Sequence, residues 1–256
     1  MVRRCFGAPG YVAAMAEEER LLETGEGPMG TFVVHPDDAG PHPVVVFLMD
    51  APGKRPLLHA MACRIASHGY YVMLPNLYYR TTPAFELDWS SEDSLARMGE
   101  LMRNVGNRMV ARDVGALLAH AATDPMANAT RVGIVGYCMS GPFALWSAAE
   151  YATQVRAVAS FYGVRLHVDK SDSPHHRLTE TNGEIYVGAA EFDDWVPLEM
   201  IDRYEAAMQA VDARGRVERY WGMHHGFAFD DRPAYDRNAD RRHWRELLGL
   251  FDRNLH

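Results

Sequence analysis

Residues 131–146, Arg131-Val-Gly-Ile-Val-Gly-Tyr-Cys138-Met-Ser-Gly-Pro-Phe-Ala-Leu-Trp146, carry the strongest signal for the fold. Residues 132–135 are apolar and mostly β-branched, which predicts a short buried strand. Residues 143–149 are apolar and compatible with a helix. Small residues, Gly136 and Ser140, fill the tight turn between them, where strand and helix pass close together. The pattern predicts a strand, a turn and a helix, with Cys138 at the apex as a nucleophile elbow.

Cys138 has two interpretations at this position. The N-terminus of a helix has a partial positive charge that favours the thiolate, the reactive form of cysteine. Free cysteine also packs like a small hydrophobic residue, so a buried structural cysteine at a strand end is the alternative. The rest of the chain has to distinguish these two interpretations.

The composition is that of an ordinary globular chain with a large core. Of its 256 residues, 48% are hydrophobic and 23% are charged, close to average usage. The net charge of −8 argues against a nucleic-acid partner or an anionic membrane surface. No run of 18 apolar residues exists, so the sequence predicts no transmembrane helix.

The N-terminal region and the cysteines bear on localisation. Residues 1–20 lack the apolar core of a secretory signal, and we expect them to form a loosely ordered arm. The three cysteines, Cys5, Cys63 and Cys138, are odd in number and lack a spacing pattern. This count argues against a disulfide framework and predicts a protein of the reducing cytoplasm.

Strands and helices alternate along most of the chain. The predicted strands are residues 31–34, 44–49, 70–74, 132–135, 155–161, 184–189 and 217–220. The predicted helices are residues 57–67, 94–122, 143–149, 197–213 and 233–255. Such alternation predicts an α/β fold with a mainly parallel, doubly wound sheet. No repeat or break in composition divides the chain, so we expect a single domain over residues 21–256.

A nucleophilic cysteine needs a base, and the base needs an orienting acid. In α/β-hydrolases both follow the nucleophile in the chain, first the acid and then the histidine, each after a strand. Asp193 and Asp194 follow the predicted strand 184–189. His224 and His225 follow the predicted strand 217–220. The expected residue types therefore stand in the expected order.

Simpler interpretations exist for the same residues. Asp193 or Asp194 could cap the helix that follows, because aspartate before a helical proline is a common helix start. His224 and His225 could be a solvated loop pair. Together with His175 and His176 they could also form a zinc site, but no metal-ligand spacing supports one.

These motifs together resemble those of the dienelactone hydrolase family (carboxymethylenebutenolidases), over residues 25–256. The family elbow corresponds to Gly136-Tyr-Cys138-Met-Ser140-Gly141, with serine in place of a glycine. Two further family motifs correspond to Asp193-Asp-Trp-Val-Pro197 and to His225-Gly-Phe227. The resemblance implies an α/β-hydrolase fold without a large lid domain and without a cofactor. It also implies a catalytic triad of Cys138, Asp193 and His225.

The resemblance also marks three positions around the triad. The family has a glutamate that contacts the resting cysteine, and Asp50 stands at that place, which implies a cysteine-modulating acid one methylene shorter. Of the two arginines that hold the carboxylate of dienelactone, one corresponds to Arg80 and the other is replaced by Phe229. Arg80 could equally be a surface ion-pair partner. With one arginine, the pocket should hold a single carboxylate less firmly.

The chemistry that follows is acyl transfer through a thioester. The backbone N–H groups of Met139 and Ala51 would form the oxyanion hole. A thiol, with a pKa of about 8.5, leaves a tetrahedral intermediate more readily than an ordinary alkoxide does. We therefore expect activated esters or enol lactones as substrates. The predicted pocket walls, some of which could be ordinary core aromatics, are Tyr78, Tyr79, Tyr162, Trp195, Phe227 and Phe229.

Other functions remain open on the sequence alone. One is a broader carboxylesterase or thioesterase on the same scaffold. Another is a non-catalytic ligand-binding or redox-sensing relative, in which Cys138 is an oxidisable thiol. We expect a small ester or lactone as the partner, no metal, and a monomer or weak homo-oligomer.

Overall fold

A computed structural model describes residues 14–256. The chain divides into two compact units, one ending at Val132 and the other beginning at Gly133. Strand β5 (Ala127–Tyr137) continues through the boundary between them. The single domain expected over residues 21–256 stays a prediction.

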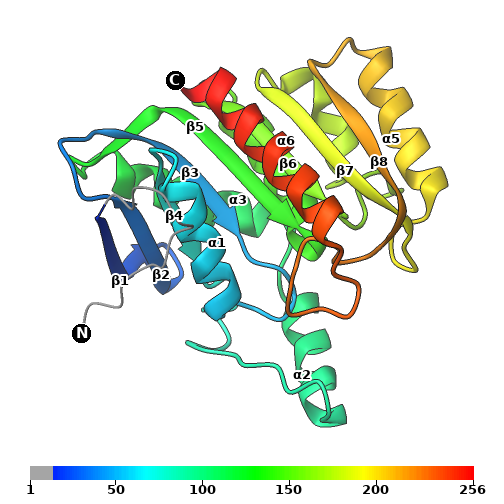
Figure 1. Cartoon of the computed structure of the whole chain (residues 1–256), viewed down its shortest axis with the longest axis horizontal. Helices are drawn as coiled ribbons and strands as arrows, with labels where there is room; N and C mark the ends of the chain where they lie inside the picture. The colour runs from blue at the N-terminus through cyan, green and yellow to red at the C-terminus, as the bar shows by residue number, and fades with distance from the viewer. Residues whose placement is uncertain (1–13) are drawn as a thin grey trace. The chain divides into compact units, whose positions relative to one another are not determined.

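The first unit contains four strands ahead of β5. They are β1 (Met15–Thr24), β2 (Gly27–Pro36), β3 (His42–Leu48) and β4 (Tyr71–Pro75). Their order in the sheet is β1-β2-β4-β3. β1 pairs antiparallel with β2, β2 pairs antiparallel with β4, and β3 and β4 are parallel (Figure 1). Nearly every side chain of β3 and β4 is buried, as expected for strands covered on both faces.

Three helices complete the first unit: α1 (Pro56–Ala66), α2 (Glu92–Arg103) and α3 (Asn107–Ala121). α1 packs against β2 and β4, and α3 packs against β1 and β3. Proline at the first position of α1 suits a helix start. α2 buries only Leu101, whereas α3 buries a full face of eight residues.

The second unit begins with the end of β5 and contains three more strands. They are β6 (Val155–Phe161), β7 (Glu184–Phe192) and β8 (Gly215–His224), in the order β5-β6-β7-β8. β6, β7 and β8 are parallel. The helical segments are the 3-10 turns η1 (Cys138–Ser140) and η2 (Pro174–Glu180), and the helices α4 (Gly141–Glu150), α5 (Leu198–Ala210) and α6 (Arg237–Leu255).

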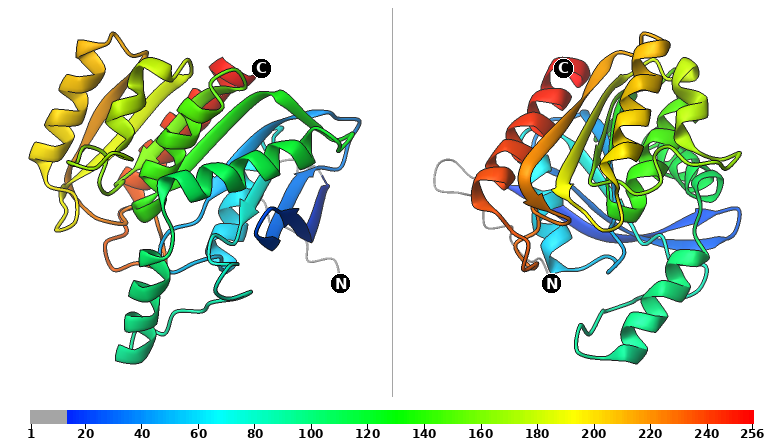
Figure 2. Two further views of the ribbon diagram at one scale, coloured as in Figure 1. Left: turned by 180° about the vertical axis from the view of Figure 1, so that it is seen from behind. Right: turned by 90° about the vertical axis from the view of Figure 1, so that its right-hand side faces the viewer.

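Helices cover both faces of the sheet in the second unit. α6 packs on β6 and β7, while α4 packs on β6 and α5 packs on β7 and β8. Figure 2 shows α6 on one face, with α4 and α5 on the other. The predicted α/β fold with a mainly parallel, doubly wound sheet is confirmed.

The predicted elements agree with the observed ones except in a few places. Residues 15–20, expected in a loose arm, belong to β1, because they pair in register with β2. The remainder of that arm, residues 1–13, lies outside the described residues. The predicted helix 94–122 is two helices, α2 and α3, which a short segment ending at Gly106 separates. α6 begins later than predicted, because the Asp236 carboxylate caps it by accepting hydrogen bonds from two backbone N–H groups.

Within residues 14–256, no helix combines the length and the apolar character that crossing a membrane requires.

Candidate active site

Cys138 lies at the turn between β5 and α4, in the strand–turn–helix arrangement that the sequence predicts. Its φ of 55° is in the left-handed region, where a non-glycine residue is strained. A Cβ on Gly136 would lie 2.2 Å from the backbone oxygen of Ser140, so only glycine fits there. The backbone therefore projects Cys138, whose side chain is a partly exposed thiol outside any disulfide bond, from the apex of the elbow.

Ser140 closes this turn with its hydroxyl group. The hydroxyl accepts a hydrogen bond from the Tyr137 N–H at 2.9 Å and donates one to the Tyr137 carbonyl at 3.0 Å. The side chain is fully buried. Serine, where the resemblance predicts glycine, thus adds two hydrogen bonds inside the elbow without obstructing it.

Asp193 and His225 form a close pair at the ends of β7 and β8. Oδ2 of Asp193 lies 2.6 Å from Nδ1 of His225, and the Asp193 side chain is fully buried. Oδ1 accepts a second hydrogen bond, at 3.0 Å, from the Trp195 N–H. An acid in this position fixes the tautomer of the imidazole and leaves Nε2 as the basic nitrogen.

The neighbouring candidates do not enter this pair. Asp194 is exposed, and α5 begins after Pro197 without a side-chain cap, so neither aspartate caps that helix. His224 is exposed as well, and its ring packs against that of Phe192 at 5.3 Å.

Two aromatic side chains enclose the His225 ring. The centroid of Tyr162 lies 4.9 Å away, and Trp195 meets the ring edge-on at 4.8 Å. Nε2 of His225 is buried and has no hydrogen-bond partner among residues 14–256. A buried nitrogen without a hydrogen-bond partner destabilises a protein core. Here the missing partner leaves Nε2 able to accept a proton.

Phe227 and Phe229, two of the predicted pocket walls, are buried in the second unit. Phe227 stacks on Tyr220 with centroids 4.4 Å apart, and Phe229 packs against Tyr137 at 5.0 Å. Tyr162 is also buried and adopts a φ of 39° directly after β6. Trp195, by contrast, is 66% exposed. Of the predicted walls in this unit, Trp195 therefore has the most surface available to a ligand.

The loop after β3 carries Asp50 and Ala51 in the first unit. Asp50 is buried and forms an ion pair with Arg55, with Nη1 2.5 Å from Oδ1. The Tyr78 hydroxyl donates a hydrogen bond of 2.7 Å to the Ala51 carbonyl and so fixes the orientation of that peptide. The sequence interpretation missed Arg55, although a buried aspartate five residues earlier was a signal for a cationic partner. The modulating role of Asp50 and the oxyanion roles of Ala51 and Met139 stay predictions.

Arg80 makes an internal ion-pair network in the first unit. Its guanidinium donates two hydrogen bonds to Asp113, at 2.9 and 2.6 Å, and two to Glu26, at 2.9 and 2.5 Å. It also lies over the Tyr79 ring at 4.4 Å, and the Tyr79 hydroxyl donates to Asp113. These contacts match the alternative interpretation of Arg80 as an ion-pair partner, and they leave little of its hydrogen-bonding capacity for a substrate carboxylate.

The cysteines differ from the expectation in one respect. Cys63, in α1, is disulfide-bonded. A disulfide bond at this residue does not fit the reducing environment that the cysteine count predicts. Cys5 lies outside the described residues.

Two of the histidines considered for zinc, His175 and His176, form a stack of rings with His167. His175 lies 3.7 Å from His167 and 3.9 Å from His176 between ring centroids. Burial, followed by the two neighbouring imidazoles, lowers the pKa of His175 to about 4. Among residues 14–256 no group of three or more histidine, cysteine or acidic side chains could hold a metal ion.

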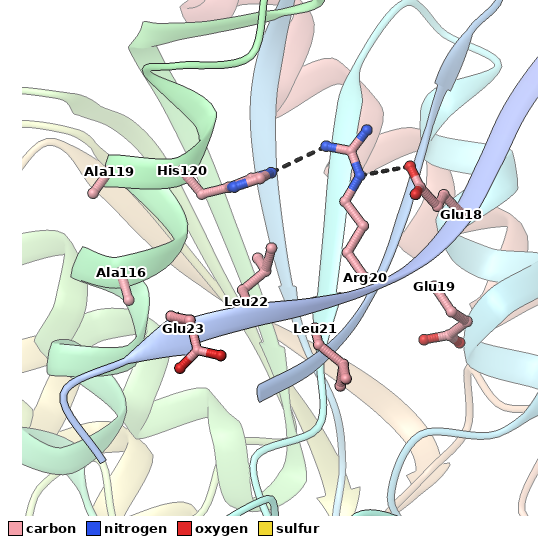
Figure 3. Close-up of a pocket in the computed structure, with 9 residues that line it drawn as sticks. All are labelled: Glu18, Glu19, Arg20, Leu21, Leu22, Glu23, Ala116, Ala119 and His120. Carbon is pink, nitrogen blue, oxygen red and sulfur yellow. Dashed lines mark hydrogen bonds and ion pairs between the residues drawn. The ribbon is translucent and has the colours of Figure 1, made fainter. Parts of the chain in front are cut away.

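A pocket of about 780 Å³ lies between β1 and α3 in the first unit (Figure 3). Acidic side chains of β1 and alanines of α3 line it, and Arg20 bridges Glu18 and His120. None of the predicted site residues is among its lining residues.

Comparisons with known proteins agree with these motifs. The family model described as "Dienelactone hydrolase family" matches residues 29–255. A "Putative carboxymethylenebutenolidase" of Synechocystis sp. is 27% identical over 227 residues, which cover 88% of this chain and 91% of that protein. A "Probable 2-oxo-3-(5-oxofuran-2-ylidene)propanoate lactonase" of Bradyrhizobium sp. is 24% identical over 221 residues, or 85% of this chain and 86% of the relative.

Solved structures share the fold. The crystal structure of a "Putative Dienelactone Hydrolase" from Klebsiella pneumoniae superposes with a TM-score of 0.83 at 23% identity, over 93% of this chain and 99% of that one. Because the identity is below 25%, this likeness concerns the fold alone.

Proposed function

The chain belongs to the dienelactone hydrolase family, and we propose that it hydrolyses activated carboxylic esters or enol lactones through a thioester on Cys138. The observation that carries the proposal is the Asp193–His225 pair at 2.6 Å, with a buried Nε2 that has no hydrogen-bond partner within residues 14–256. Cys138, at the strained elbow of the same unit, supplies the nucleophile.

In the proposed acylation step, His225 Nε2 takes the proton of the Cys138 thiol, and the thiolate attacks the ester carbonyl. The approach of thiol and imidazole is expected to tighten when substrate binds. The oxyanion would be held by the backbone N–H of Met139, at the first turn after the elbow. The C–O bond then breaks, the departing oxygen takes the proton from His225, and a thioester remains on Cys138.

In the proposed deacylation step, water replaces the leaving group. His225 accepts a proton from that water as it attacks the thioester carbonyl. The C–S bond breaks, the sulfur regains a proton from His225, and the carboxylic acid is released. Asp193 stabilises the imidazolium in both steps and keeps its ring oriented.

The sulfur nucleophile favours substrates with good leaving groups. Attack of a thiolate on a simple alkyl ester gives an intermediate that expels the thiolate again, because the thiolate is the weaker base. Enol, aryl and thiol leaving groups compete with the thiolate more effectively. We therefore propose enol lactones, aryl esters and thioesters as the substrate class.

A broader carboxylesterase or thioesterase activity is the second candidate, and the environment of Arg80 favours it. That guanidinium is bound to Asp113 and Glu26, and buried Phe229 stands where the resemblance predicts another arginine. Each of these two residues by itself offers a substrate carboxylate few or no cationic contacts. Uncharged esters should therefore be accepted as well as lactones that carry a carboxylate.

We also propose the partner, the oligomeric state and the location of the protein. A small ester or lactone as partner follows from the family. A monomer or weak homo-oligomer and a cytoplasmic location stay predictions, and the disulfide at Cys63 argues against the latter.

A hydrolysis panel tests the proposal. Wild type and Cys138→Ser are each assayed with an enol lactone, a p-nitrophenyl ester and the matching ethyl ester. We expect turnover of the first two, slow turnover of the ethyl ester, and a large loss of rate in Cys138→Ser, because serine needs full deprotonation by His225. Equal rates on all three esters would contradict the leaving-group argument.

Thiol labelling separates catalysis from the redox-sensing alternative. Rapid alkylation of Cys138 by iodoacetamide, slowed in His225→Ala, supports a catalytic thiolate. Slow alkylation at the same rate in both proteins would favour a merely oxidisable thiol.

A further inference from the structure

The pairing of β7 and β8 is irregular immediately before the Asp193–His225 pair. Ala190 pairs with Tyr220, and the next pair is Phe192 with His224. One residue of β7, Glu191, thus stands opposite three residues of β8. The middle one of these, Gly222, has a φ of +77°, so β8 bulges at this point. Bulges next to active sites commonly redirect the side chains that follow them.

Glu191 holds this bulge with its side chain. Its Oε2 accepts a hydrogen bond of 2.6 Å from the Gly222 N–H. A bulge removes backbone groups from the ladder, and because Gly222 is exposed, water is the alternative partner for its N–H. The carboxylate replaces the missing ladder partner with a charge-assisted bond, which is stronger than a neutral one.

The bond joins the two chain segments that carry the acid and the histidine. Glu191 is two residues before Asp193, and Gly222 is three residues before His225. The two segments follow the neighbouring parallel strands β7 and β8. The distance between the two segments is therefore set at the bulge. The 2.6 Å contact between Asp193 and His225 depends on that separation.

We infer that Glu191 is a positioning residue, which sets the geometry of the Asp193–His225 pair through its hydrogen bond to the Gly222 N–H. This inference rests on the proposed Cys138–His225–Asp193 mechanism. Glu191 has no role in the chemical steps themselves, and it acts only through the backbone of β8.

Two substitutions at Glu191 separate the hydrogen bond from the charge. Glu191→Ala removes both, whereas Glu191→Gln keeps an oxygen that can accept from Gly222 and removes only the charge. Glu199→Ala serves as the matched control, because Glu199 is an exposed glutamate of the same unit, in the first turn of α5. Gly222→Ala tests the other partner of the hydrogen bond. The added Cβ would have no heavy atom within 4 Å, so the substitution acts only through backbone strain at a φ of +77°.

The kinetic readouts are kcat and KM for a p-nitrophenyl ester, with kcat/KM followed against pH. Displacing catalytic groups by a fraction of an ångström to 1 Å costs on the order of 10- to 100-fold in rate. We expect a loss of that size in kcat for Glu191→Ala, with KM changed less than about twofold. Glu191→Gln should restore kcat to within about threefold of wild type, and Glu199→Ala should match wild type.

A readout independent of turnover is the rate at which iodoacetamide alkylates Cys138. Displacing the imidazole weakens its hold on the thiol proton, so Glu191→Ala should slow this alkylation by more than Glu191→Gln does. A merely structural Glu191 would lower the melting temperature while leaving kcat and the alkylation rate unchanged.

Three outcomes overturn the inference: wild-type kcat in Glu191→Ala, a Glu191→Gln variant as slow as Glu191→Ala, or an unchanged rate of Cys138 alkylation in Glu191→Ala. Failure of the proposed function is distinguishable from these. In that case the wild type itself would hydrolyse no ester, or Cys138→Ala would be as active as wild type.

Discussion

Oδ2 of Asp193 lies 2.6 Å from Nδ1 of His225, and the aspartate side chain has no exposed surface. A carboxylate buried to this extent needs a partner, and the imidazole provides one. The contact is local to the second unit, and it joins two loops that follow neighbouring strands.

Asp193→Asn tests the role of this carboxylate. The amide cannot stabilise the imidazolium and favours the wrong tautomer, so we expect kcat to fall by up to about 10⁴-fold without loss of the fold. Steady-state kinetics and circular dichroism measure the two effects. Asp194→Asn, at the exposed neighbour, should change kcat by less than about threefold, and a reversal of the two results would assign the acid to Asp194.

Ser140→Ala tests the closure of the elbow. The substitution removes both hydrogen bonds between the Ser140 hydroxyl and the Tyr137 backbone in a buried turn, which we expect to cost about 1–3 kcal/mol of unfolding free energy in urea. Ser147→Ala is the matched control, because that serine is also fully buried but its hydroxyl has no partner within residues 14–256. Equal losses in both variants would show that the Ser140 hydrogen bonds contribute nothing.

Arg80→Ala distinguishes a structural arginine from a substrate ligand. Removing the guanidinium leaves the buried Asp113 carboxylate without its cation, so we expect a loss of about 3 kcal/mol in unfolding free energy. Arg112→Ala, whose side chain is 61% exposed, should cost less than about 1 kcal/mol.

The kinetic result for Arg80→Ala is equally informative. KM should change alike for an uncharged ester and for one that carries a carboxylate, because Arg80 is bound to Asp113 and Glu26. An unchanged stability, with a KM raised only for the carboxylate substrate, would instead make Arg80 the ligand that the resemblance implies.

Asp124 predicts a pH dependence of stability in the first unit. Burial raises its pKa, but hydrogen bonds from Arg20, the Met126 N–H and Tyr71 outweigh this and lower the pKa from 3.8 to about 2. A carboxylate with a lowered pKa stabilises the folded state above pH 3.8, and its contribution disappears as the pH falls toward 2.

The expected contribution of Asp124 is about 2 kcal/mol. Urea unfolding from pH 7 to 2 should show Asp124→Asn less stable than wild type at pH 7, with the difference vanishing near pH 2. Asp37→Asn, at an exposed aspartate, should follow wild type at every pH. A difference that persists at pH 2 would contradict the assignment.

Much of the second unit could be predicted from the sequence, because its signals are local. Glycine at 136 marks a turn that no other residue fits, and aspartate and histidine directly after buried strands mark the ends of a parallel sheet. β1 was not predicted, since its charged residues resemble a solvated arm until they are paired with β2. The break between α2 and α3 was missed for a similar reason, because apolar spacing continued across it.

The roles of Arg80 and Glu191 could not be predicted, because their partners are distant in sequence. Asp113 is 33 residues from Arg80, and Gly222 is 31 residues from Glu191. No periodicity or motif links such pairs. The hydrogen bonds of the Ser140 hydroxyl could not be predicted for another reason. Serine in place of the family's glycine indicates that a small side chain fits there, but not which groups its hydroxyl binds.

Mass spectrometry of the acyl-enzyme tests the proposed mechanism most directly. The protein is mixed with excess p-nitrophenyl ester, quenched in acid within the first turnovers and digested. We predict one acyl group on the peptide that contains Cys138, released by hydroxylamine as a thioester and missing in Cys138→Ala, which should also be inactive. Full turnover in Cys138→Ala, or an acyl group on another residue of the wild type, would contradict Cys138 as the nucleophile.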